Sequence, residues 1–141
     1  MAIYFHNHQV ALATLRRLQQ EKYGKEIALI LPCKTRWGSS FSCIDHLCKT
    51  KLAIRSTITE DHLNLDDETK TLITSDIFWN NIEKLQNFLG PFSICIKKLE
   101  GDESLLSTAY LEYQQLKIHV RNNNNLPKSI CDAIEKFGSN R

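Results

Sequence analysis

Six consecutive residues, Lys34-Thr35-Arg36-Trp37-Gly38-Ser39, carry the side chains best suited to chemistry in this chain. They lie where an apolar run ends and a helical pattern begins, so their side chains can face a partner instead of a core. A guanidinium such as that of Arg36 can hold a phosphate through two hydrogen bonds, and an indole such as that of Trp37 can stack on an unpaired base. The residue types of this pair are therefore compatible with contact to nucleic acid. The open alternative is that Trp37 packs this segment onto the neighbouring helices, because large aromatic side chains are usually well buried.

Positive charge is concentrated in the part of the chain that contains this pair. The formal net charge is only +2, but residues 1–60 hold nine Lys or Arg against four Asp or Glu, a net charge of +5. Residues 61–112 hold four against ten (net −6), and residues 113–141 hold five against two (net +3). A basic surface around an aromatic is compatible with binding to a phosphate backbone, although charge runs are often solvated helix faces. The side chains predicted to contact nucleic acid are those of Lys34, Arg36, Trp37, Lys49, Lys51 and Arg55.

Residues 43–48, Cys-Ile-Asp-His-Leu-Cys, are the only cluster of possible metal ligands. On a helix Cys43 and His46 share one face, but Cys48 lies about 140° around the axis from Cys43. Structural zinc requires four ligands, and no second pair stands at a usable spacing. We therefore expect thiols at buried or boundary positions, free because the five cysteines are an odd number without a secretory signal, and we expect no metal or cofactor.

No catalytic signature accompanies these residues. The chain lacks a Gly-x-Ser-x-Gly elbow, a His-Glu-x-x-His helix and a glycine-rich phosphate loop, and the Asp66-Asp67 pair stands at a predicted helix start, where carboxylates are favoured. We therefore expect no enzymatic activity. No apolar run approaches the roughly 18 residues that span a bilayer, and residues 1–12 lack the features of a signal peptide. The expected location is intracellular, and nuclear if the protein binds DNA.

The Thr35-Arg36-Trp37 segment in this setting resembles the Thr-Arg-Trp segment of the hAT family of DNA transposases, which also follows a short apolar stretch and leads into a leucine-rich helix. Upstream, Phe5-His6-Asn7-His8 and residues 11–15 look like the helix that precedes the motif in the family. Downstream, residues 78–82 look like the next helix pair. The resemblance covers roughly residues 1–121 and implies the all-helical insertion that interrupts a ribonuclease-H-like catalytic domain.

The resemblance implies a transposon-derived fragment that is catalytically incomplete. In the family the acidic metal-binding triad lies outside this insertion, and neither it, nor the zinc finger, nor the C-terminal dimerisation segment is recognisable here. The family's Arg-Trp pair handles the transposon end, with the Trp stacking on a base turned out of the duplex, and these roles fall on Arg36 and Trp37. The implied partner is DNA, as a transposon end or flanking hairpin. The alternative function is a helical protein-interaction or dimerisation module with no nucleic-acid role.

Helical periodicity dominates the rest of the chain and predicts an all-α bundle of five or six helices. A short extended connector is expected at about residues 27–36, because this stretch has no second strand to pair with. The expected helices span about residues 7–23, 39–58, 66–74, 76–99 and 103–120, with Asn7, Ser39 or Ser40, Asp66 or Asp67, and Ser75 or Asp76 as N-caps and Gly24 as a stop. The expected core faces of the first two helices include Val10, Ala11, Leu15 and Leu18 on the first, and Phe41, Ile44, Leu47 or Cys48, Ala53 or Ile54, and Ile58 on the second.

The strongest pattern runs through residues 76–99. Apolar side chains alternate at steps of four and three, which predicts a seam for a second helix, at Phe78, Ile82, Leu85, Leu89, Phe92, Ile96 and Leu99. Gly90-Pro91 predicts a kink or a break within it. A matching pattern from Leu106 to Val120 predicts an antiparallel hairpin with the preceding helix. The predicted organisation is a bundle at 1–121, an Asn-rich linker at 122–126, and a short terminal helix with a tail at 127–141.

Overall fold

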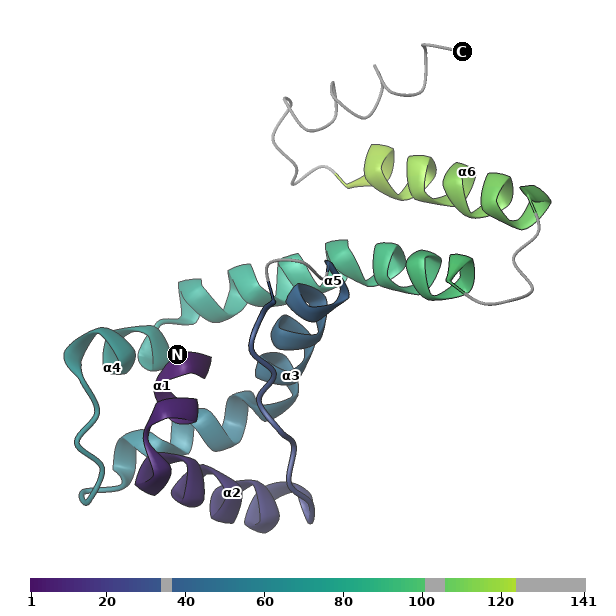
Figure 1. Ribbon diagram of the computed structural model, residues 1–141. Coiled ribbons are helices and arrows are strands. Elements are labelled where there is room, and N and C mark those ends of the chain that lie inside the picture. Colours follow the sequence, from purple (N-terminus) through teal and green to yellow (C-terminus); the bar gives the residue numbers. More distant parts are fainter. Residues whose placement is uncertain (34–36, 101–105, 124–141) are drawn as a thin grey trace. The chain divides into compact units, whose positions relative to one another are not determined.

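The computed structural model describes residues 1–33, 37–100 and 106–123, and every regular element in these ranges is helical (Figure 1). The expected all-α fold is therefore confirmed. The elements are α1 (Ala2–Asn7), α2 (Gln9–Tyr23), α3 (Trp37–Ser56), a 3-10 turn η1 (Thr57–Thr59), α4 (Asp67–Thr74), α5 (Asp76–Leu99) and α6 (Leu106–Asn122). The predicted terminal helix and most of the predicted linker lie outside the described residues.

The chain forms two compact units, Met1–Gln86 and Asn87–Arg141, and helix α5 contributes to both. The larger unit has one core to which each of its five helices gives at least one fully buried apolar side chain, among them Phe5, Leu15, Ile54, Ile73 and Trp79. Burying such a side chain stabilises a fold by roughly 1.5–3 kcal/mol. This core positions the candidate site residues of α3.

The N-terminal helix differs from the prediction. Asn7 ends a separate short helix, α1, and His8 stands between the two helices in an extended conformation, with φ −116° and ψ 100°. Val10 is 63% exposed, so α2 buries Ala11, Leu15 and Leu18 without it. The end of α2 is as predicted, because Gly24 takes a left-handed φ of 66° and donates its N–H to the Gln20 carbonyl.

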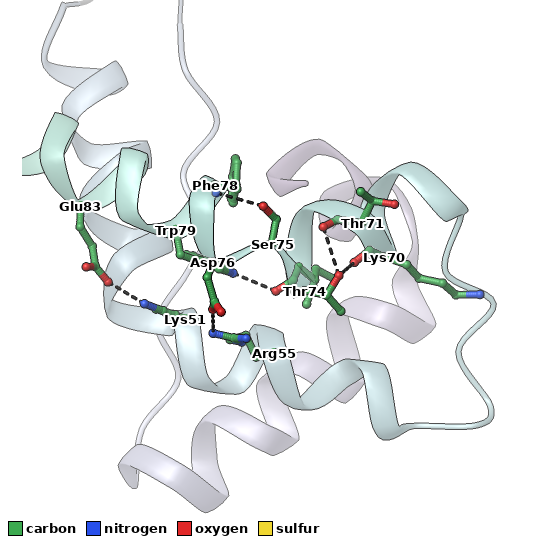
Figure 2. Close-up of polar contacts among 11 residues, drawn as sticks. Lys51, Arg55, Lys70, Thr71, Thr74, Ser75, Asp76, Phe78, Trp79 and Glu83 are labelled. Atoms are coloured by element: carbon green, nitrogen blue, oxygen red, sulfur yellow. Dashed lines mark hydrogen bonds and ion pairs between the residues drawn. The ribbon is translucent and has the colours of Figure 1, made fainter.

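Two predicted caps begin α4 and α5, and the second lies at the corner between these helices. The Asp66 carboxylate accepts the Thr69 N–H at 2.7 Å, and the Ser75 hydroxyl accepts the Phe78 N–H at 3.1 Å. One residue further on, the Trp79 indole N–H donates to the Ile73 carbonyl at 2.9 Å, so the polar end of this buried ring has its partner (Figure 2).

The end of α3 also differs from the prediction. The helix stops at Ser56 and continues as η1, which buries Thr57 and leaves Ile58 37% exposed. The Thr57 hydroxyl donates to the Ile54 carbonyl at 2.6 Å, and this bond satisfies its buried oxygen. Ile58 was therefore wrongly assigned to the core, because a turn replaces the last residues of the expected helix.

The apolar seam expected along α5 is displaced by one residue in the larger unit. Trp79 is fully buried, and Glu83 and Gln86 reach side chains of α3, whereas Leu85 is 42% exposed. The three inward residues have the same spacing as the predicted seam. Because Trp79 enters the core in place of its neighbour Phe78, which only packs at the core's edge, the helix turns a different face to α3.

The smaller unit contains the predicted antiparallel hairpin. His119 donates to the Phe88 carbonyl at 3.1 Å and stacks on the Phe88 ring near one end, and Lys98 pairs with Glu112 near the other. A kink or a break was expected at Gly90-Pro91; α5 runs through Pro91 as one helix, so there is no break. The inward side chains Phe88, Phe92 and Cys95 again follow the seam spacing, one residue away from part of the predicted set.

The connector, residues 27–36, is held to the helices by side chains. The buried amide of Gln19 donates to the Ile27 carbonyl at 2.9 Å and accepts the Ile27 N–H at 3.0 Å. His46 donates to the Ala28 carbonyl at 2.5 Å. The described part of the connector, residues 27–33, forms neither helix nor strand and runs along α3 in Figure 1, as an extended connector was expected to do.

Replacement of Gln19 by leucine should destabilise the protein by about 1–3 kcal/mol, because both backbone groups of Ile27 would lose their partner. The measurement is the free energy of unfolding from urea denaturation. Gln20→Leu is the matched control, since Gln20 is exposed on the same helix and its replacement should change stability by no more than about 0.5 kcal/mol. Equal stabilities of the two variants would contradict this role of Gln19.

Candidate nucleic-acid interface

The segment predicted to contact DNA lies at the start of α3. Lys34 and Arg36 lie outside the described residues, and so does the side chain of Trp37, whose backbone is the first of the helix. The Ser39 hydroxyl accepts the Cys33 N–H at 2.8 Å and donates to the Cys33 carbonyl at 3.1 Å. The backbone on either side of residues 34–36 is therefore held together. The helix begins two residues before Ser39, so the expected N-cap at Ser39 or Ser40 is wrong.

Lys49 projects from α3 but is engaged by a carboxylate. Its ammonium lies 2.5 Å from Asp45 one turn earlier, and the second oxygen of Asp45 accepts a hydrogen bond from Gln86 at 2.9 Å. Burial of Asp45 would raise its pKa, but the hydrogen bonds from Lys49 and Gln86 outweigh burial and hold the pKa below its usual value. The charge of Lys49 thus serves first to balance Asp45.

Lys51 and Arg55 are also paired with acids, in both cases from α5 (Figure 2). The Lys51 ammonium lies 2.7 Å from Glu83 and 5.8 Å from the centre of the Trp79 ring, within range of a cation–π contact. The Arg55 guanidinium lies 2.8 Å from Asp76. Lys51 and Arg55 therefore join α3 to α5, whereas Lys49 is paired within α3.

The remaining basic residues of the first sixty differ in their surroundings. Arg16 lies 3.6 Å from Glu26, and Arg17 lies 2.6 Å from Glu21 and 2.8 Å from Glu60. Lys22 and Lys25 are exposed and form no ion pair within the part of the chain that the structure describes. Among the described residues of the first sixty, the positive charge not already balanced by a carboxylate is therefore found at the end of α2 and in the turn that leads to the connector.

The Cys43–Cys48 stretch does not form a metal site in the described residues, where no group of three or more His, Cys, Asp or Glu side chains converges. Burial raises the pKa of the Cys43 thiol, and burial is also the main cause of the raised pKa of Cys48. His46 uses its Nδ1 to hold the connector. These side chains therefore fill and brace the helix, and their thiols are free.

Two features of the structure, one in each unit, could not be predicted from the apolar pattern. Trp79 underlies Lys51. The only signal for its burial in the sequence was that it stands next to Phe78 of the predicted seam. Helix α6 leaves large apolar side chains in solvent, at Leu106 (90% exposed), Tyr110 (63%), Leu111 (61%), Ile118 (58%) and Tyr113 (41%). Such a set on one short helix is unusual for a surface that has no partner.

Comparisons with protein families, with curated proteins and with solved structures found no match to this chain. Across the described ranges, no helix combines the length and the apolar character needed to cross a membrane.

The stability contributed by Asp45 should depend on pH. Because its pKa is lower in the folded protein than in the unfolded chain, the contribution is present above the unfolded value of about 3.9 and is lost as the pH falls through the folded pKa. Asp45→Asn should therefore be less stable than the parent at neutral pH, and the difference should shrink in acid. Urea denaturation across this range measures it. The exposed Asp61→Asn is the control and should show a much smaller pH-dependent difference; equal behaviour would contradict the role of Asp45.

Proposed function

We propose that this chain is a transposase-like, catalytically incomplete helical domain that contacts DNA through residues 34–37. The observation that supports it best is the distribution of charge. Of the seven basic residues of the first sixty that the structure describes, five are paired with carboxylates, namely Arg16, Arg17, Lys49, Lys51 and Arg55. The two without an ion pair in the described residues, Lys22 and Lys25, stand shortly before Lys34 and Arg36 in the sequence.

The chemistry of the segment fits this role. A guanidinium at position 36 can bind a phosphate, while an indole at position 37 can stack on any base that has left the duplex. Backbone anchoring by Ser39 on the far side of the segment lowers the cost of ordering it on binding. Few phosphates can be neutralised by so small a set of cations, so the affinity should be modest and strongly dependent on salt.

The test is a salt titration of binding to a duplex and to a hairpin with unpaired bases. Arg36→Ala should weaken binding to both and reduce the salt slope by about one, because one phosphate contact is lost. Trp37→Ala should weaken hairpin binding by about 1–3 kcal/mol and duplex binding less, since stacking requires an available base. Lys84→Ala, at an exposed position of α5 without an ion pair in the described residues, is the control and should bind as the parent does.

The two alternatives for Trp37 separate in the same experiment. A folded Trp37→Ala variant that binds both DNAs like the parent would contradict the stacking role. Loss of folding in this variant would assign Trp37 to packing instead. A purified chain that cleaves DNA with Mg²⁺ would contradict the proposal that the chain is catalytically incomplete.

A second candidate function, self-association, is favoured by the exposed apolar side chains of α6. Leu106, Tyr110 and Tyr113 lie at steps of four and three, which places them along one stripe of the helix. The partner we assign to this stripe is a second copy of the chain, because a two-fold axis pairs such a stripe with itself. In an antiparallel pairing, the positive N-terminal end of each helix would lie beside the negative C-terminal end of the other, which is favourable.

Analytical ultracentrifugation over a wide concentration range tests this candidate. The parent chain should shift from 16.3 kDa towards twice that mass as its concentration rises. Tyr110→Lys should abolish the shift, because a charge at the centre of an apolar contact is costly to bury. Val10→Lys is a matched control, since Val10 is equally exposed on α2. A parent chain that stays monomeric at every concentration, or a Tyr110→Lys variant that still associates, would contradict the candidate.

A further inference from the structure

The connector and α2 enclose a groove that neither candidate function uses. Its volume is about 220 Å³, and its walls include Leu12, Leu15, Arg16, Gln19, Ile27 and Leu29. Sites for drug-sized ligands usually measure roughly 300–1,000 Å³, so this groove is small for a cofactor. The walls also include the polar residues His6 and Glu26, and the apolar part formed by the leucines and Ile27 suits a single aliphatic side chain.

The connector beside the groove has the backbone features of an unpaired edge strand. Leu29 and Leu31 pack against the core, whereas Ile30 between them is half-buried without joining that core cluster and Ala28 before them is exposed. Side chains at every second position therefore face the core, as in a β-strand with one buried face. Gln19 bonds both the N–H and the carbonyl of Ile27, as a residue of a neighbouring antiparallel strand would do. Through Gln19, α2 thus takes the place of a neighbouring strand at Ile27 only.

The next backbone groups along the connector have no partner. Within the described part of the chain, the N–H and carbonyl groups of Leu29, Ile30 and Leu31 make no hydrogen bond. In an extended chain alternate residues point these groups to opposite edges, so Leu29 and Leu31 face the same edge as Ile27. That is the edge next to α2 and the groove. Rows of unpaired backbone groups on an apolar segment are templates for a further strand.

We propose that this edge binds an extended polypeptide segment by strand addition, with an aliphatic side chain in the groove and acidic residues beside it. The segment pairs its backbone with Leu29 and Leu31, where main-chain bonds give affinity and the groove gives specificity. The charge around the groove defines the acidic flanks. Arg16 and Glu26 both line the groove, 3.6 Å apart, and both side chains are more than half exposed. The neighbouring Lys25 has no ion pair in the described residues, so these three side chains together carry a net positive charge.

The probe is a fluorescein-labelled peptide, Glu-Asp-Val-Thr-Val-Thr-Val-Asp-Glu, titrated with the full chain and followed by fluorescence anisotropy. Saturable binding is expected. The same peptide N-methylated at its valines keeps every side chain but loses backbone donors, so it should bind at least roughly tenfold more weakly. A version with lysine flanks should also bind more weakly. Absence of saturable binding, or equal binding of the N-methylated peptide, would overturn the proposal.

Two proline variants locate the edge. Leu29→Pro removes an N–H from the proposed edge and should weaken binding roughly tenfold, whereas Ile30→Pro removes one from the opposite edge and should change it much less. Hydrogen exchange on the parent chain gives the same answer without any variant. The peptide should protect the amides of Leu29 and Leu31 and leave that of Ile30 unprotected, and protection of none or of all three would contradict strand addition.

A duplex DNA competitor separates this site from the proposed DNA contact. If the duplex displaces the peptide completely, and the Leu29→Pro variant binds the peptide like the parent, the peptide is held by charge alone and the proposal fails. If Arg36→Ala weakens DNA binding but leaves the peptide bound, the two sites are independent and strand addition is supported. If the chain fails to bind DNA but binds the peptide as expected, the proposed DNA contact is contradicted and strand addition is still supported.

Discussion

The burial of Trp79 is the interaction on which the larger unit depends. Its ring is fully buried, and its N–H reaches the Ile73 carbonyl across the corner between α4 and α5. A buried indole without an acceptor would leave an unsatisfied donor in the core, so the corner and the ring require each other. With that corner fixed, α5 can present only one face to α3, and the face is set by the position of Trp79.

The face that α5 turns towards α3 determines which side chains the basic residues of α3 contact. Glu83, one turn beyond Trp79, meets Lys51, and Gln86 meets Asp45, which in turn holds Lys49. Asp76 at the start of the same helix meets Arg55. The basic side chains of α3, which the sequence suggested as a cationic surface, therefore take part in the polar contacts between α3 and α5, directly or, for Lys49, through Asp45. Each exposed ion pair of this kind adds little stability, but its carboxylate neutralises a positive charge that could otherwise bind a DNA phosphate.

The accuracy of the sequence-based predictions follows the range of the interactions involved. The helix stop at Gly24 and the caps at Asp66 and Ser75 depend on bonds within a few residues, and they were predictable. The caps expected at Asn7 and at Ser39 or Ser40 were wrong, because a capping residue type does not by itself fix where a helix begins. The partners of Lys51 and Arg55 stand 32 and 21 residues away, and no local pattern identifies them. The one-residue shift of the α5 seam has the same origin, because an amphipathic pattern fixes the spacing of a face but not which of two adjacent large side chains enters the core. The residue types at the proposed DNA contact were evident, whereas the role of Gln19 was hidden, since a glutamine on a helix usually faces solvent.

The connector combines order with unused bonding capacity, and this combination explains why both proposals converge on it. Gln19 fixes Ile27, His46 fixes Ala28, and Ser39 fixes Cys33, so the chain is held before and after residues 29–31. A segment held in this way has already lost much of the conformational freedom that binding would remove, and a partner need not order it again. The two proposed contacts use different groups, because side-chain charges can act on DNA while the backbone edge pairs with a strand. Their physical signatures differ accordingly: the first weakens steeply with salt, and the second depends on hydrogen-bond donors that salt does not remove.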